Sequence, residues 1–74
     1  MNKYRKQNIL IIRNDLRRCK DNLQNILDEE QMYFDNMPEN LQGSLRGMES
    51  EDSIDVMENS IEILEKIIDD LLNI

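Results

Sequence analysis

The chain has 74 residues, of which 34% are charged and 4% are aromatic, and its formal net charge is −7. A chain of this length forms a single domain that buries a low fraction of its surface, so a second domain is excluded. It contains no histidine and no tryptophan, and its one cysteine excludes a disulfide framework.

Apolar residues in the first half recur in alternating steps of three and four, which is the a/d pattern of a helix packed along one side. We call this row the first seam; it consists of Ile9, Ile12, Leu16, Cys19, Leu23, Ile26, Glu30 and Tyr33. No glycine or proline precedes Pro38. We therefore expect a first helix from about residue 3 to about residue 34.

Residues 35–48 are expected to connect two helices. Pro38 suits the start of a helix, so a single helical turn is expected inside the connection. Gly43 is expected to end that turn in the left-handed conformation. Ser44 or Ser50 can cap the helix that follows by accepting a hydrogen bond from a backbone amide.

The second helix is expected to begin between Ser44 and Ser50, at about residue 49 because Gly47 weakens an earlier start, and to run to residue 74. Its apolar residues follow the same alternation of steps, and this second seam consists of Ile54, Met57, Ile61, Leu64, Ile68 and Leu71. Acidic residues gather in its first turns, where they interact favourably with the helix dipole.

Folding the chain back on itself aligns the two seams in pairs whose residue numbers sum to 83 or 84. The expected pairs are Ile12 with Leu71, Leu16 with Ile68, Cys19 with Leu64, Leu23 with Ile61 and Ile26 with Met57. The same register predicts that Lys20 faces Glu65. Residues 1–27 carry a formal charge of +5 and residues 28–74 carry −12, so the two halves attract each other. The predicted fold is all-α, an antiparallel helical hairpin in one domain.

Additional apolar residues lie outside the seams and predict association into a four-helix bundle, most simply a two-fold dimer, or a larger oligomer. The residues assigned to self-association are Leu10, Leu27, Val56, Ile63, Ile67 and Ile74. The alternatives for the same stripe are a different protein or a membrane surface. The negative charge disfavours contact with anionic lipids, so no membrane partner is expected.

Two groups of residues are candidates for binding another protein. Carboxylates on the second helix could mimic the phosphates of a nucleic acid and occupy a basic groove; they are Glu58, Glu62, Glu65 and Asp69. Around the turn, Tyr33, Phe34, Met37 and Leu41 either cap the end of the bundle or form a binding patch.

Two other functions remain as alternatives. In one, an oligomer sequesters a nucleotide with Lys3, Tyr4, Arg5 and Lys6, because cations and a stacking ring suit phosphates and bases. In the other, helical carboxylates hold Mg²⁺ for nucleotide hydrolysis. We expect neither catalysis nor a cofactor nor a resident metal, and the sequence pI near 4.4 disfavours nucleic-acid binding.

The stretch from Tyr33 to Ser44, which reads YFDNMPENLQGS, is followed by an acidic helix with paired isoleucines. This segment, over roughly residues 28–74, resembles a group of short, acidic, uncharacterised helical proteins of bacteria and prophages. The resemblance implies helical architecture and an origin in a mobile element, and it carries no functional residues over. The apolar run Ile9–Ile12 is too short for an export signal, so we expect the bacterial cytoplasm. The leading hypothesis is a self-associating protein that binds and modulates a host protein.

Overall fold

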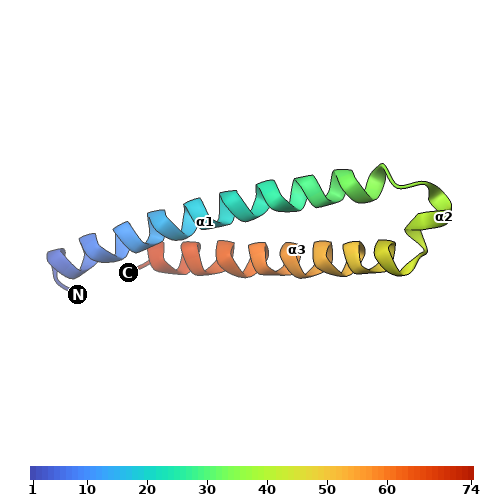
Figure 1. The fold of residues 1–74 in the computed structure, drawn as a ribbon. Helices are drawn as coiled ribbons and strands as arrows, with labels where there is room; N and C mark the ends of the chain where they lie inside the picture. The colour runs from blue at the N-terminus through green and yellow to red at the C-terminus, as the bar shows by residue number, and fades with distance from the viewer.

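The computed structural model describes residues 1–74 and consists of two long helices joined by a short one (Figure 1). The helices are α1 (Lys3–Asp35), α2 (Glu39–Gln42) and α3 (Leu45–Leu72). α3 runs back along α1, and the Cα atoms extend over 58 × 14 × 13 Å. The predicted all-α hairpin is confirmed, and no helix has an apolar stretch long enough to cross a membrane.

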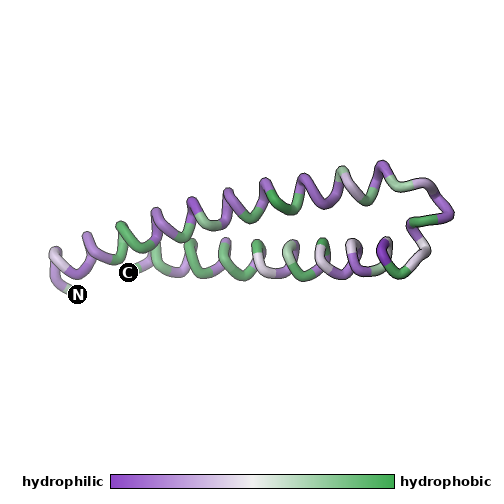
Figure 2. The backbone as a smooth tube through the Cα atoms, viewed as in Figure 1, coloured by the Kyte–Doolittle hydropathy of each residue, from purple (hydrophilic) through white to green (hydrophobic).

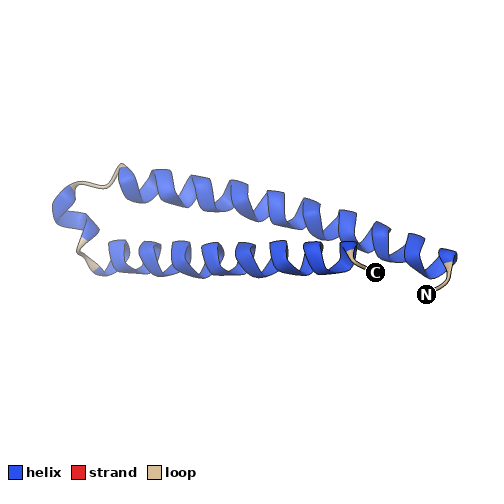
Figure 3. Ribbon diagram, turned by 180° about the vertical axis from the view of Figure 1, so that it is seen from behind, coloured by secondary structure: helices blue, strands red, loops and turns tan.

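α1 begins after Asn2, whose side-chain Oδ1 accepts a hydrogen bond of 2.9 Å from the backbone N–H of Arg5. It ends at Asp35, one residue beyond the expected end, before Pro38 disfavours further helix. The N-terminal end of α1 extends past the C-terminus of α3, as Figures 1 and 3 both show. We call residues 1–8 the overhang, and all of them are exposed.

The expected helical turn in the connection is α2, which Pro38 precedes. The side-chain amide of Gln42 closes the turn, because its Nε2 donates to the carbonyl oxygens of Phe34 at 3.1 Å and Met37 at 3.4 Å. The expectation for Gly43 was wrong. Its φ of −84° and ψ of 0° lie in the right-handed region, and no residue of the chain has a positive φ.

α3 starts at Leu45, at the early end of the expected range, because Ser44 rather than Ser50 caps it by accepting from the N–H of Gly47 at 3.4 Å. Helix propensity alone would suggest that Gly47 weakens this start, but the helix begins there all the same. A Cβ atom at Gly47 would lie 2.1 Å from the carbonyl oxygen of Gln42. The missing side chain therefore lets α2 pack directly on the first turn of α3.

The second seam is confirmed. Ile54, Ile61 and Ile68 are buried, and the residues between them in the seam are half-buried, namely Met57, Leu64 and Leu71. Gly47 and Ser50 continue this buried row toward the turn. Hydrophobic residues accordingly concentrate in the C-terminal part of α3, where it meets α1 (Figure 2).

The first seam is only half right. The structure keeps Ile9, Leu16, Leu23 and Glu30 at least half-buried, but exposes Ile12, Cys19, Ile26 and Tyr33. Their places are taken by the residues one position further on, which are Arg13, Lys20, Leu27 and Phe34. The expected pairs that involve Ile12, Cys19 and Ile26 are therefore wrong.

The reason for the difference is a small rotation of α1. On a helix, the residues three and four positions after a given residue lie about 40–60° from it, one on each side. The spacing alone therefore fits the row with Ile12, Cys19, Ile26 and Tyr33 and also the row with the residues that follow each of them. The row that packs against α3 in the structure forms a hydrogen bond and an ion pair with it. Arg13 Nε donates to the carbonyl oxygen of Ile68 at 2.8 Å, and Lys20 Nζ lies 4.0 Å from Glu65 Oε1. The second contact confirms the predicted pairing of Lys20 with Glu65 and the antiparallel register.

Candidate interaction surfaces

One side of the hairpin is charged. Arg17 and Lys20 of α1 line a shallow depression together with Glu65 and Asp69 of α3. One turn away, Gln24 lines a similar depression together with Glu58 and Glu62. All four acidic residues predicted to bind a partner therefore lie on this side.

These carboxylates belong to a longer row. Residues at alternating steps of four and three form one exposed line along α3, which we call the acidic ridge: Glu51, Asp55, Glu58, Glu62, Glu65 and Asp69. Neighbouring members are about 5 Å apart along the helix axis. Glu65 and Asp69 lie beside the cations Lys20 and Arg17, whereas Glu58 and Glu62 lie beside an uncharged amide. The ridge is therefore most negative toward the turn.

The opposite side of the hairpin is apolar. Because Arg17, Lys20 and Gln24 flank the seam of α1 on the charged side, the row of Ile12, Cys19, Ile26 and Tyr33 must flank it on the other. By the same geometry, α3 presents Val56, Ile63, Ile67 and Ile74 on this side. We call these eight residues the apolar face. Ile12, Ile26, Val56 and Ile63 are each more than half exposed, at 53%, 55%, 65% and 60%.

The predicted self-association residues divide into three groups. Val56, Ile63, Ile67 and Ile74 belong to the apolar face. Leu10 is 46% exposed, but it lines a depression with Leu71 and Leu72 at the open end of the hairpin. The assignment of Leu27 to self-association was wrong, because Leu27 is only 7% exposed and packs inside the hairpin. Sequence reasoning had placed its neighbour Ile26 inside instead.

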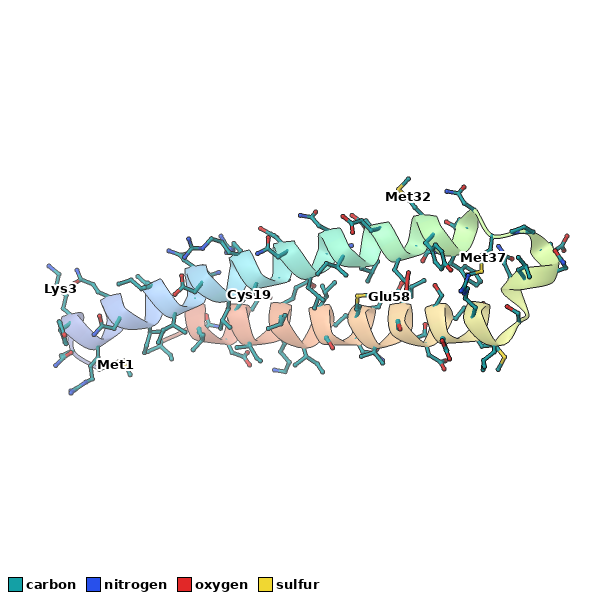
Figure 4. All side chains as sticks on the ribbon, viewed as in Figure 1. Met1, Lys3, Cys19, Met32, Met37 and Glu58 are labelled. Carbon is teal, nitrogen blue, oxygen red and sulfur yellow. The ribbon has the colours of Figure 1, made fainter.

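The four residues predicted around the turn do not form one surface. Phe34 and Met37 are half-buried, and Met37 lies in the angle between the end of α1 and the start of α3 (Figure 4). Tyr33 and Leu41 are 46% and 48% exposed. Two of the four therefore close the end of the hairpin, which is the capping role the sequence suggested, and Tyr33 contributes to the apolar face.

Within one chain, the four residues of the overhang that were predicted to bind a nucleotide point in different directions. Lys3, Tyr4, Arg5 and Lys6 are consecutive residues of one helix, so their side chains leave it at successive steps of about 100°. Lys6 lines a depression whose other five residues are apolar. No group of three or more cysteine, aspartate or glutamate side chains lies close enough together to hold a metal ion.

Comparison with known proteins adds no constraint, because no family model, no curated protein and no solved structure matches this chain.

Sequence reasoning missed two residues that shape the connection, Gln42 and Gly47. A glycine two residues inside a helix, close after a polar connection, is the signal that could have indicated a close approach of backbones. No comparable signal marks Gln42.

Proposed function

We propose that this chain is a non-catalytic interaction module of the bacterial cytoplasm, carried by a phage or another mobile element. It self-associates through the apolar face and binds a basic surface of a host protein through the acidic ridge. The two surfaces lie on opposite sides of the hairpin, so binding at one leaves the other accessible.

The observation that carries the proposal is a row of exposed apolar residues along one side of a hairpin with a very small core. Only four apolar residues are buried, namely Leu27, Ile54, Ile61 and Ile68. The hairpin exposes 5732 Å² to solvent. A compact protein of 8.8 kDa exposes about 4,800 Å², so the excess is about 900 Å². A stable dimer buries roughly 800 Å² on each partner, so one additional copy accounts for the excess.

Charge supports a basic partner for the acidic ridge. Residues 28–58 carry ten carboxylates and one arginine. None of these ten carboxylates forms an ion pair within the chain, and three of them, Glu51, Asp55 and Glu58, belong to the ridge. A regular row of free negative charges accelerates encounter with a positively charged surface and selects against acidic partners.

Capture from a bacterial lysate with matched charge variants tests the role of the ridge. The bait variant Glu58→Gln/Glu62→Gln removes two charges from the ridge, and Glu39→Gln/Glu49→Gln removes two charges elsewhere. We expect a partner that the wild type and the second variant retain and that salt releases. The ridge variant is expected to lose about tenfold in affinity, which is about 1.4 kcal/mol. Equal retention by both variants would show that the ridge is not the binding surface.

A further inference from the structure

We propose that the second copy stacks antiparallel on the apolar face, related by a two-fold axis that crosses the hairpin at the level of Cys19 and Glu65. This inference rests on the self-association part of the proposed function and specifies its geometry. In such a dimer α1 packs on α1 of the second copy, and α3 packs on α3 of the second copy. Every helix is then antiparallel to its neighbours, as in an ordinary four-helix bundle.

The first support is the symmetry of the exposed row on α1. Ile12 and Ile26 lie seven residues before and after Cys19. An antiparallel second copy centred on Cys19 therefore sets Ile12 against Ile26 of the second copy, and Cys19 against its own counterpart. At the ends of the row, Arg5 meets Tyr33 of the second copy, where a guanidinium can stack on the ring.

The second support is an independent symmetry on α3. Ile63 and Ile67 lie two residues on either side of Glu65, and Val56 and Ile74 lie nine residues on either side. An antiparallel copy centred on residue 65 therefore sets Ile63 against Ile67 and Val56 against Ile74. All four exposed apolar residues of α3 on this side find an apolar counterpart.

The two centres coincide in space. Lys20 forms an ion pair with Glu65, and Arg17 and Lys20 share one depression with Glu65 and Asp69, so Glu65 lies within about one helical turn of the level of Cys19. A single two-fold axis thus satisfies the pairs on both helices. An isologous interface requires this self-complementarity.

Charge selects the antiparallel arrangement over the other two-fold stacking. The alternative axis runs along the length of the hairpin and places the two turn ends together. Residues 28–58, which form the turn half, carry a formal charge of −9, whereas the remaining residues carry +2. The alternative therefore places two turn halves, each with a formal charge of −9, beside each other. The antiparallel copy sets each turn half beside the open end of the other copy, and Lys3 of the overhang comes level with Asp35 of the second copy.

Cross-linking with a short bifunctional maleimide tests the geometry. We expect wild-type protein to form a covalent dimer through Cys19, and Cys19→Ser to form none. In the Cys19→Ser background, a mixture of Ile12→Cys and Ile26→Cys chains should cross-link, whereas either variant alone should not. The expected rate is at least about tenfold above that of Ile11→Cys on the outer surface, because the dimer raises the effective thiol concentration.

The outcomes separate the geometry from the proposed function. A dimer mass without cross-linking through Cys19 or between residues 12 and 26 would overturn the antiparallel arrangement and leave self-association standing. A monomer mass would overturn both, and the apolar face would then serve another occupant. Far-ultraviolet circular dichroism of each variant verifies that the helices are retained.

A charge reversal provides a test that does not depend on cysteine chemistry. Lys3→Glu/Arg5→Glu changes two exposed residues of the overhang, and glutamate is well tolerated in the first turn of a helix. The antiparallel dimer sets these residues beside the acidic turn half of the second copy, so we expect dimerisation to weaken about tenfold at low salt. Unchanged or tighter dimerisation would contradict the antiparallel arrangement.

Discussion

The guanidinium Nε of Arg13 donates a hydrogen bond of 2.8 Å to the carbonyl oxygen of Ile68, across the two long helices. This carbonyl lies near the C-terminus of α3, where the helix dipole favours a cation. The bond explains why a charged residue is half-buried in the seam of a small hairpin. Its aliphatic stem covers apolar surface while its head reaches the backbone of α3.

Arg13→Ala is expected to lower the free energy of unfolding by about 1–2 kcal/mol, because it removes both a charge-assisted hydrogen bond and the packing of the stem. Urea unfolding at fixed protein concentration measures the loss. Arg18→Ala is the matched control, since Arg18 pairs only with Asp15 of the same helix at the surface. Its effect should stay below about 0.5 kcal/mol, and an equal effect of both variants would refute the role of Arg13.

The two glycines should respond in opposite directions to alanine. At Gly47 a Cβ atom would meet the carbonyl oxygen of Gln42 at 2.1 Å, so Gly47→Ala should destabilise by about 1–3 kcal/mol. At Gly43 nothing lies within 4 Å and φ is −84°, so Gly43→Ala should be neutral or stabilising by up to about 1 kcal/mol. Thermal unfolding of the pair measures both effects. Stabilisation by Gly47→Ala would mean that α2 does not pack on α3 as described.

Ser50→Ala should stabilise the hairpin or leave it unchanged. The Ser50 hydroxyl is buried and has no hydrogen-bond partner, so its removal relieves a desolvation cost of about 1 kcal/mol. Ser53→Ala, at an exposed position of the same helix, corrects for the higher helix propensity of alanine. A loss of more than about 1 kcal/mol relative to this control would indicate an unseen partner for the hydroxyl.

Adjacent residues of α1 should separate hairpin stability from association. Leu27 is 7% exposed, so Leu27→Ala should cost about 2–4 kcal/mol of unfolding free energy by leaving a cavity. Ile26 is 55% exposed, so Ile26→Ala removes little from the hairpin itself. Ile26→Ala should instead weaken dimerisation, measured by sedimentation. In a two-fold dimer the substitution is present on both copies, so the apolar contact is lost twice. Equal dissociation constants for wild type and Ile26→Ala would exclude Ile26 from the interface.

Much of the fold follows from sequence pattern alone. The unbroken stretch before Pro38 predicts the extent of α1, and the row from Ile54 to Leu71 predicts the buried side of α3. The register follows from the two seams together and is confirmed by Lys20 and Glu65. These features depend on periodicity, which a single sequence displays directly.

The rotation of α1 and the details of the connection could not be predicted in this way. A purely apolar seam favours Ile12 and Cys19, whereas the folded chain buries the stems of Arg13 and Lys20, because their polar heads find partners on α3. The charged side was partly predictable, since four of the six members of the acidic ridge were expected from the sequence to bind a partner. Which side of the hairpin exposes apolar residues depends on the rotation, and so only the structure defines the apolar face.

Sedimentation equilibrium of the wild-type chain at micromolar concentration tests most directly whether the apolar face is covered by a second copy. We expect a mass of about twice 8.8 kDa, which shifts toward the single-chain value when Ile63→Glu places a charge on that face. Ile11→Glu, at an equally exposed position on the outer surface of α1, should leave the mass unchanged. A wild-type mass of 8.8 kDa across this range would contradict the account.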